Sequence, residues 1–398
     1  MELVTHDAGD RPQLPPDDLI AHYLAARERT RAICAPLAIE DHVVQPVPEV
    51  SPPKWHLAHT SWFFEKFILE RHRQDYRRFD RHYHLLFNSY YKAAGPHWLQ
   101  AERGTLSRPT VAEIHAYRDH IDEAMTGLLR DHDGDNALAF LIDLGIHHEQ
   151  QHQELLLMDI KYILGVNPHQ PAYGFTELAA DHGAARWESF EAGIYTIGAS
   201  PPAFCFDNER PRHRVWLDRF ALFSRPVTNG EYLEFISDGG YHDSRLWLST
   251  GWDWVNRCRI TAPLYWTPHD GGWQVYTLGG AHSIDPDAPV CHISYFEADA
   301  YARWSGGRLP TEQEFEVAVP EPEPQAVWCW TQSHYSPYPG FEPFAGDIGE
   351  YNGKFMCGQF VLRGGCVATP RGHYRPSYRN FFEPQQRWMY SGIRLARN

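Results

Sequence analysis

The sequence predicts an α+β protein that consists of a four-helix bundle followed by a strand-rich domain. In the first 170 residues, apolar side chains recur at helical spacing. In residues 185–398, short β-like runs alternate with turns that are rich in Gly, Pro, Trp and Asp. A chain of 398 residues is also long enough for two domains. We therefore expect one domain at residues 1–170 and a second at 185–398.

Four segments of the first domain have helical patterns. They are residues 15–37, 55–72, 110–132 and 137–165. Thr110 and Glu113 fit a capping box at the start of the third segment, and Gly165 fits the end of the fourth. Four such helices are typical of an up-down bundle. Between the second and third helices lies an aromatic segment, residues 79–104, whose length predicts a functional loop.

The second domain shows short strands interrupted by short helices. Strands are expected within residues 194–199, 213–223 and 360–365, and helices within residues 228–240 and 294–306. Runs this short, separated by many turns, predict a domain with much irregular structure.

Charge and cysteine content exclude several classes of protein. The formal net charge of −15, without a basic stripe, argues against a nucleic-acid-binding protein and against binding to an anionic membrane surface. No apolar run is long enough to span a membrane, and the acidic, Pro-rich residues 1–18 do not resemble a signal peptide. Seven cysteines without a CxxC pair disfavour a disulfide framework or a structural zinc site. We therefore expect a cytoplasmic protein.

The sharpest local feature is the histidine pair of His148-Glu149-Gln150-Gln151-His152. On a helix, residues i and i+4 share one face, so both imidazoles can reach one metal ion. A solvated polar face would also explain the pair in a chain with 24 histidines. The same five residues match the zinc-hydrolase motif H-E-x-x-H, in which Glu149 would be the general base. Zinc hydrolysis is therefore an alternative function.

A third histidine, His59, lies within the second helical segment, and in a bundle the metal ligands project inward from facing helices. One histidine from this helix and two from the fourth would leave open coordination positions, as a catalytic metal requires. Imidazole binds iron, zinc and copper, so the pattern alone leaves the metal undetermined. A histidine satisfied within the core is the other interpretation of His59.

Four long motifs, in order along the chain, resemble the EgtB family of ergothioneine-pathway sulfoxide synthases. The motifs are SPPKWHLAHTSWFFEKFIL, LFNSYYKAAGPHW, HHEQQHQELLL and LRGGCVATPRGHYRPSYRNFFEPQQRWMYSGIRLAR. The resemblance covers nearly the whole chain. It implies a DinB-like four-helix bundle followed by a formylglycine-generating-enzyme-like domain, which is related to C-type lectins. This agrees with the two domains expected from the sequence pattern.

The resemblance also implies a reaction. His59, His148 and His152 match the Fe(2+) ligands of the family. The substrates are hercynine (N-trimethylhistidine), a thiol donor and O₂, and the enzyme joins sulfur to C2 of the imidazole and oxidises it to the sulfoxide. Iron(II) can pass an electron to O₂ and zinc cannot, which favours iron for this chemistry.

Further site residues follow from the same resemblance. Tyr90 and Tyr91 match a catalytic tyrosine pair, and Gln151 matches a residue that contacts hercynine. Asn380 and Phe381 match the wall that the second domain contributes to the hercynine site. Arg103 in the long loop is our candidate for binding the carboxylate of the donor.

Two cysteines depart from the family pattern. Cys329 stands in W-C-W-T where the family has W-E-W-T, and Cys366 stands in R-G-G-C where it has R-G-G-S. Either these are two small buried side chains, or they indicate a paired or redox-active site or a local change in donor chemistry. FNSYY favours free cysteine as the donor over γ-glutamylcysteine, and the alternative is a selenosugar, as in the selenoneine synthases of the family. The sequence leaves open the oligomeric state and whether the second domain binds calcium.

Overall fold

A computed structural model of the protein describes residues 16–131, 135–175, 185–321 and 323–398. These residues form two compact units. The helical unit contains the described residues up to Asn167, together with Ser200–Phe206 and Glu342–Gly353. The sheet unit contains the described residues of Pro168–Ala199, Asp207–Phe341 and Lys354–Asn398. Two short segments from the second half of the chain thus pack with the helical unit, and the expected domain bounds, 1–170 and 185–398, stay a prediction. The predicted absence of a signal peptide concerns residues that lie largely outside the described ones.

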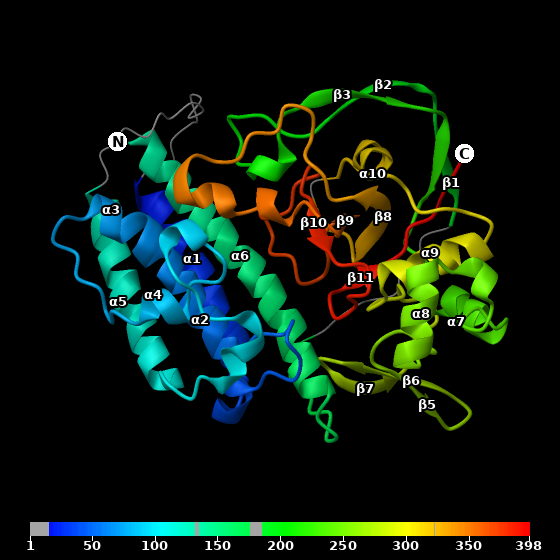
Figure 1. The fold of residues 1–398 in the computed structure, drawn as a ribbon, viewed down its shortest axis with the longest axis horizontal. Coiled ribbons are helices and arrows are strands. Elements are labelled where there is room, and N and C mark those ends of the chain that lie inside the picture. The colour runs from blue at the N-terminus through cyan, green and yellow to red at the C-terminus, as the bar shows by residue number, and fades with distance from the viewer. Residues whose placement is uncertain (1–15, 132–134, 176–184, 322) are drawn as a thin grey trace. The chain divides into compact units, whose positions relative to one another are not determined.

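The helical unit is built on the four-helix bundle that the sequence predicts (Figure 1). Its long helices are α1 (Pro16–Cys34), α2 (Pro53–Phe64), α5 (Val111–Arg130) and α6 (Asn136–Gly165). The capping box at the start of α5 is confirmed, because Thr110 Oγ1 accepts from the Glu113 N–H at 3.2 Å and the Thr110 N–H donates to Glu113 Oε2 at 2.7 Å. Such a cap fixes where the helix begins.

Helix α2 is the centre of this unit, because every one of its residues is buried. A helix that is buried on all sides must satisfy its polar side chains internally. The ammonium group of Lys54 donates to the backbone oxygens of Leu106 and Pro109. Thr60 and Ser61 accept from two buried arginines described below. The helix then passes into a π-helical turn, Glu65–Leu69, and a last turn, α3 (Glu70–His72).

Close approach between α2 and α6 depends on Gly145. A Cβ atom at this position would lie 2.5 Å from Cε1 of Phe64, a ring that is itself fully buried. Real side chains do not approach this closely, so the glycine leaves the space that the ring occupies.

The long aromatic segment that follows α3 contains short helical turns rather than one extended loop. They are α4 (Tyr83–Leu86) and the 3₁₀ turns Lys92–Ala94 and Gln100–Thr105. A further 3₁₀ turn, Ile39–Val43, lies between α1 and α2. Asn88 ties the segment together, because its side-chain amide donates to the backbone oxygen of Tyr91 and its side-chain oxygen accepts from the Tyr91 N–H.

The sheet unit contains four small sheets, ordered β1-β4-β12, β10-β9-β8-β11, β2-β3 and β5-β6-β7. The only parallel pair among these strands is β11 with β8. Strand bounds are β1 Trp187–Phe190, β2 Gly193–Ile197, β3 His213–Leu217, β4 Phe220–Phe223, β5 Trp266–His269, β6 Gly272–Thr277, β7 Gly280–Ser283, β8 Trp328–His334, β9 Phe360–Arg363, β10 Asn380–Phe382, β11 Ser391–Gly392 and β12 Ala396–Arg397. Short strands in several small sheets confirm the strand-rich, irregular domain that the sequence predicts.

Four helices accompany these sheets: α7 (Asn229–Ser237), α8 (Ser249–Cys258), α9 (Tyr295–Trp304) and α10 (Glu312–Ala318). Helices α7, α9 and α10 each begin with a capping box, Ser or Thr followed three residues later by Glu. Within the described part of the chain, no helix is both long enough and apolar enough to cross a membrane.

Candidate metal centre

Three imidazoles from two facing helices converge inside the helical unit. His59 comes from α2, and His148 and His152 come from consecutive turns of α6. One ring nitrogen from each lies within 4.8 Å of the other two. Among the described residues this is the only group of three or more His, Cys, Asp or Glu side chains with such geometry. The structure therefore brings together the three histidines that the sequence singled out.

The electrostatics of the cluster keep these imidazoles neutral, which is the form that binds a metal. Burial lowers the pKa of all three rings well below the usual range, and the neighbouring imidazoles lower it further. Nε2 of His59 lies 3.1 Å from Nε2 of His148. Two imidazole lone pairs at this distance repel one another unless a proton or a cation lies between them.

The second nitrogen of each ring has its own environment. Nδ1 of His59 donates to the backbone oxygen of Phe87 at 2.6 Å, which leaves its Nε2 lone pair for a metal. Nδ1 of His152 lies 2.9 Å from Nδ1 of His56. Nδ1 of His148 has no hydrogen-bond partner among the described residues, and its ring stacks on Phe63 at 4.4 Å. Three imidazoles with converging nitrogens fit a divalent transition metal such as iron or zinc.

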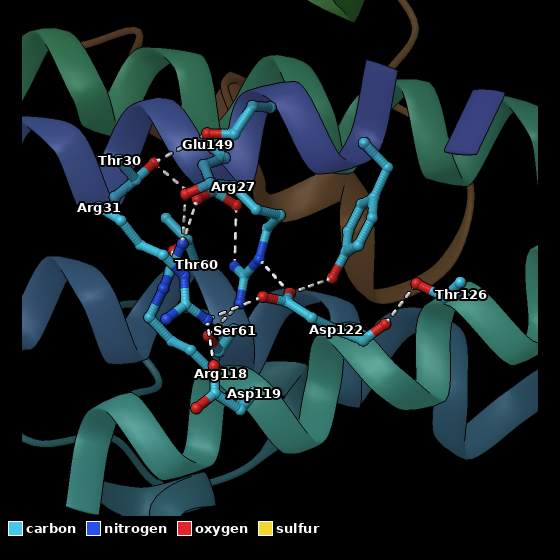
Figure 2. Close-up of polar contacts among 12 residues, drawn as sticks. Arg27, Thr30, Arg31, Thr60, Ser61, Arg118, Asp119, Asp122, Thr126 and Glu149 are labelled. Carbon is cyan, nitrogen blue, oxygen red and sulfur yellow. Dashed lines mark hydrogen bonds and ion pairs between the residues drawn. The ribbon is translucent and has the colours of Figure 1, made fainter. Parts of the chain in front are cut away.

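Glu149, the general base of the hydrolase alternative, is engaged elsewhere. Its side chain is fully buried and is held by α1 and α5 (Figure 2). One carboxylate oxygen accepts from Arg27 at 2.9 Å, and the other accepts from Arg118 at 2.9 Å and Thr30 at 2.7 Å. Burial raises the pKa of Glu149, but the two arginines outweigh that effect and lower it below its usual range. A carboxylate held by three donors is a structural ion-pair partner, and this placement argues against zinc hydrolysis.

The predicted catalytic pair, Tyr90 and Tyr91, has two different environments. Tyr91 is fully buried, and its ring packs against Phe67 at 5.1 Å and Trp62 at 5.8 Å. Tyr90 is half-buried, stacks on Tyr91 at 4.7 Å and donates to the backbone oxygen of Tyr351 at 3.4 Å. Tyr90 is therefore the more accessible phenol of the pair.

Sequence reasoning missed Tyr351, which belongs to the helical unit through the segment Glu342–Gly353. Its hydroxyl donates to the side-chain oxygen of Gln151, which precedes His152 on α6. Its ring centroid lies 5.7 Å from that of His148, and its ring stacks on Phe206 at 5.3 Å. A phenol and an amide thus stand beside the histidine cluster. No local pattern in the sequence marks Tyr351, because its role depends on a contact across 200 residues.

Two family models match the chain. The DinB superfamily model matches residues 22–156, and the sulfatase-modifying factor enzyme 1-like domain matches residues 184–321 and 326–398. The chain is 33% identical over 314 residues to hercynine oxygenase of Mycobacterium tuberculosis, a match that covers 66% of this chain and 72% of that protein. The chain belongs to the EgtB family. Hercynine oxygenase of Mycolicibacterium thermoresistibile is 32% identical over 319 residues, which cover 66% of this chain and 70% of the relative. Ergothioneine biosynthesis protein 1 of Schizosaccharomyces pombe is 27% identical over 49% of this chain and 28% of its own length.

Arg103, our candidate in this EgtB-family chain for binding the donor, is a buried cation without a carboxylate partner among the described residues. Its guanidinium carbon lies 3.3 Å from the ring centroid of Trp55, and its Nη1 donates to Ser51 at 2.8 Å. Burial lowers the pKa of Arg103 to about 9, although the nearby charge of Asp159 raises it. Its Nε has no hydrogen-bond partner in the described structure. The side chain therefore has capacity for an anionic ligand.

The remaining predicted EgtB-type site residues lie in the sheet unit. Asn380 and Phe381 form β10, where they pair with Leu362 and Val361 of β9. The Phe381 ring stacks on Tyr335 at 3.9 Å. Their assignment to a hercynine site stays a prediction from the family resemblance.

The two cysteines that depart from the EgtB pattern are both fully buried. Cys329 is a free thiol on β8, and burial raises its pKa to about 12. Cys366 follows β9, and its sulfur lies 3.6 Å from the hydroxyl of Thr369. A thiol with so high a pKa stays protonated and unreactive, so the structure favours the interpretation of Cys329 as a small core residue.

Proposed function

We propose that this protein is an iron(II)- and O₂-dependent enzyme that forms a bond between sulfur and imidazole C2 of hercynine. The observation that carries the proposal is the neutral three-histidine face, which has no protein carboxylate within its ligand group. The names of the mycobacterial relatives, hercynine oxygenase, support hercynine as the substrate. The net reaction takes one C–H bond of hercynine, one S–H bond of the donor and O₂, and it yields the sulfoxide and water.

His59, His148 and His152 would hold the iron. When bound, iron(II) supplies electrons to O₂ and lowers the pKa of a coordinated thiol. With only three protein ligands, a bound iron would have coordination positions for a thiolate and an imidazole. Holding the two groups close together would lower the entropy cost of joining them.

Polar side chains beside the cluster would orient the substrate and handle protons. The amide of Gln151 can hydrogen-bond to an imidazole nitrogen of hercynine, and the Tyr351 hydroxyl holds that amide in place. The Tyr90 and Tyr351 phenols can each hold or donate a proton, and both lie in the helical unit with the cluster. Tyr91 would support Tyr90 by stacking.

Arg103 would bind the anionic group of the donor. A buried guanidinium whose Nε is unbonded can form a bidentate pair with a carboxylate, which suits free cysteine. A selenosugar donor, which would make the enzyme a selenoneine synthase, remains the alternative, and its neutral sugar would use Arg103 only as a hydrogen-bond donor.

A donor panel tests the proposal. Iron(II)-loaded protein would be incubated under air with hercynine and with cysteine, γ-glutamylcysteine or a selenosugar, and the products would be identified by mass. We expect O₂ consumption and a hercynine adduct only with iron, hercynine and the correct donor together, and no product from His148→Ala. If the iron-loaded protein is inactive with all three donors, the proposal is wrong. Turnover with zinc in the absence of O₂ would instead support hydrolysis.

A further inference from the structure

A fourth buried histidine, His56, touches the cluster without belonging to it. His56 lies on α2 one helical turn before His59 and is 2% exposed. Its Nδ1 lies 2.9 Å from Nδ1 of His152, and its Nε2 lies 2.9 Å from Oδ2 of Asp159. The same carboxylate oxygen accepts from the backbone N–H of Ser51 at 2.8 Å. His56 therefore links one member of the cluster to a buried carboxylate.

Helix geometry explains why this link can form. Asp159 follows His152 by seven residues on α6, and two helical turns return a side chain to the same face. His56 and His59 are three residues apart on α2, which also places them on one face. Each helix thus contributes both a member of the cluster and a residue that backs it.

For a neutral His56 imidazole, the hydrogen-bonding capacity of each group sets the direction of the chain of bonds. A carboxylate only accepts, so Nε2–H of His56 donates to Asp159. A neutral imidazole then has its lone pair on Nδ1, which accepts from Nδ1–H of His152. This tautomer leaves the Nε2 lone pair of His152 available for a metal ion.

We propose that His56 and Asp159 are positioning residues for the metal: they hold His152 in its metal-binding tautomer and increase the electron density that it donates. The inference rests on the proposed function, because it takes His152 as an iron ligand. The other two imidazoles lack such support within the described structure. Nδ1 of His59 donates to a neutral carbonyl group, and Nδ1 of His148 has no hydrogen-bond partner among the described residues. A carboxylate behind an imidazole raises its basicity as a ligand, and removing such a partner weakens metal binding.

Two substitutions separate the effect of the negative charge on Asp159 from the effect of the hydrogen bonds through His56. Asp159→Asn keeps an oxygen that can accept from His56 but removes the negative charge. His56→Asn keeps an amide oxygen near Nδ1 of His152 but breaks the connection to Asp159. Cobalt(II) titration followed by visible absorption gives the metal affinity, and electrochemistry of the iron-loaded protein gives the Fe(III)/Fe(II) midpoint potential. We expect both variants to bind cobalt about 10- to 100-fold more weakly. We expect Asp159→Asn to raise the midpoint potential, since less negative charge favours Fe(II).

Glu65→Gln is the matched control, because it also neutralises a fully buried carboxylate of the helical unit. Glu65 accepts from the hydroxyls of Tyr76 at 2.6 Å and Tyr117 at 2.7 Å, and it has no bond to a cluster histidine among the described residues. Its cobalt affinity and potential should match those of the wild type. Thermal unfolding of the metal-free proteins shows which variants fold. If Asp159→Asn does not fold, the cobalt affinity of His56→Asn tests the inference.

Three results would overturn the inference. If both variants have the same cobalt affinity and midpoint potential as the wild type, His56 and Asp159 have no positioning role. This result would not contradict the proposed iron-dependent function. An equal loss of metal binding in Glu65→Gln would assign the effect to the fold. Failure of the wild-type protein to bind stoichiometric cobalt or iron would refute the proposed function itself, and the positioning role with it.

Discussion

Glu149 and His148 are neighbours in the sequence but face different surroundings, because a helix turns about 100° per residue. His148 faces His59 and His152, whereas Glu149 enters the network that α1 and α5 provide (Figure 2). Two arginines share this one carboxylate, and Arg27 is also paired with Asp122 at 2.6 Å. The residue therefore connects three helices of the bundle.

Neutralising Glu149 should destabilise the fold. In Glu149→Gln, the buried Arg118 loses its carboxylate partner and Arg27 keeps only Asp122, so we expect the free energy of unfolding to fall by about 3–5 kcal/mol. Urea unfolding measures this. The control is Asp119→Asn, which removes a mostly exposed partner of Arg31 and should change stability by less than about 0.5 kcal/mol. Unchanged stability with lost turnover would contradict us and support Glu149 as a catalytic base.

Replacing Arg103 should raise the stability of the protein but weaken substrate binding. Burial holds the pKa of this guanidinium down to about 9, so its charge is poorly compensated when the site is empty. Arg103→Met should therefore raise stability, by about 1–3 kcal/mol, because an uncompensated buried charge is replaced by an apolar side chain. For a carboxylate-bearing donor such as cysteine, KM should rise about 10- to 100-fold through loss of a charge-assisted pair.

A neutral selenosugar donor would give a different result for the same variant, namely a nearly unchanged KM. The exposed Arg108, five residues further along the chain, supplies the control, since Arg108→Met should alter neither stability nor KM. A variant of Arg103 with lowered stability would show that the charge is compensated, contrary to our reasoning.

Single residues differ in how far the sequence predicts them. The approach of His148 to His152 follows from helix periodicity alone, and the contribution of His59 needed only the assumption that the two helices face one another. The sequence could not place Glu149, because its two arginine partners lie on two other helices, and Arg27 is 122 residues away in the chain. Tyr351 and the link from His56 to Asp159 were missed for the same reason: each depends on a contact across about 100 residues or more.

Among the elements, the packing of α2 against α6 allows the most specific test. Gly145→Ala would place a Cβ atom 2.5 Å from the buried ring of Phe64. The gain in helix propensity, up to about 1 kcal/mol, should be smaller than the cost of overpacking, about 1–3 kcal/mol. We expect a lower melting temperature, measured by circular dichroism.

The control for this helix contact is Gly127→Ala on α5. There, the new methyl group would meet only the guanidinium of Arg73 at 3.3 Å, the end of a flexible side chain. This variant should be neutral or slightly stabilised. A stabilised Gly145→Ala would show that Phe64 moves more easily than its burial implies.

Element boundaries were predictable where a local signal exists. The capping box of α5 begins at the predicted Thr110, and α6 ends at Gly165 as expected. The region of residues 79–104 was expected as one loop, yet it contains α4 and two 3₁₀ turns. These turns are too short for periodicity to reveal, and they depend on tertiary contacts such as those of Asn88.

For the whole molecule, buried neutral histidines predict sensitivity to acid. Burial lowers the pKa of His59, His148, His152 and His373 well below the ordinary 6.5. Below pH 6.5 the unfolded chain therefore binds more protons than the folded chain, and the free energy of unfolding falls as the pH is lowered. At pH 5.5, each such histidine should cost up to about 1.4 kcal/mol.

The urea midpoint of the metal-free protein at pH 7.5 and 5.5 tests this expectation. The midpoint should be lower at pH 5.5, and His373→Gln should remove part of the difference without touching the metal centre. Equal midpoints at the two pH values would show that these rings are protonated in the folded state without penalty.

The order of the two domains was predictable because their composition and periodicity differ. The contacts of the folded chain group Ser200–Phe206 and Glu342–Gly353 with the helical unit, although both segments lie within residues 184–321 and 326–398, which the second family model matches. Phe204 stacks on His147 at 3.8 Å, and Phe344 packs on Phe140 at 5.2 Å. These contacts cover one flank of α6, and no rule of local sequence pattern assigns a distant loop to a helix surface.

The segments that cover this flank of α6 come after the helix in the chain, so they are synthesised after it. A ribosome releases the chain from its N-terminus, so all four long helices emerge well before the segment that carries Tyr351. Phe204, which covers His147, is synthesised well before Phe344, which covers Phe140. All three histidines therefore precede the segment that carries Tyr351, and the surroundings of the cluster are completed only after the four long helices have been synthesised.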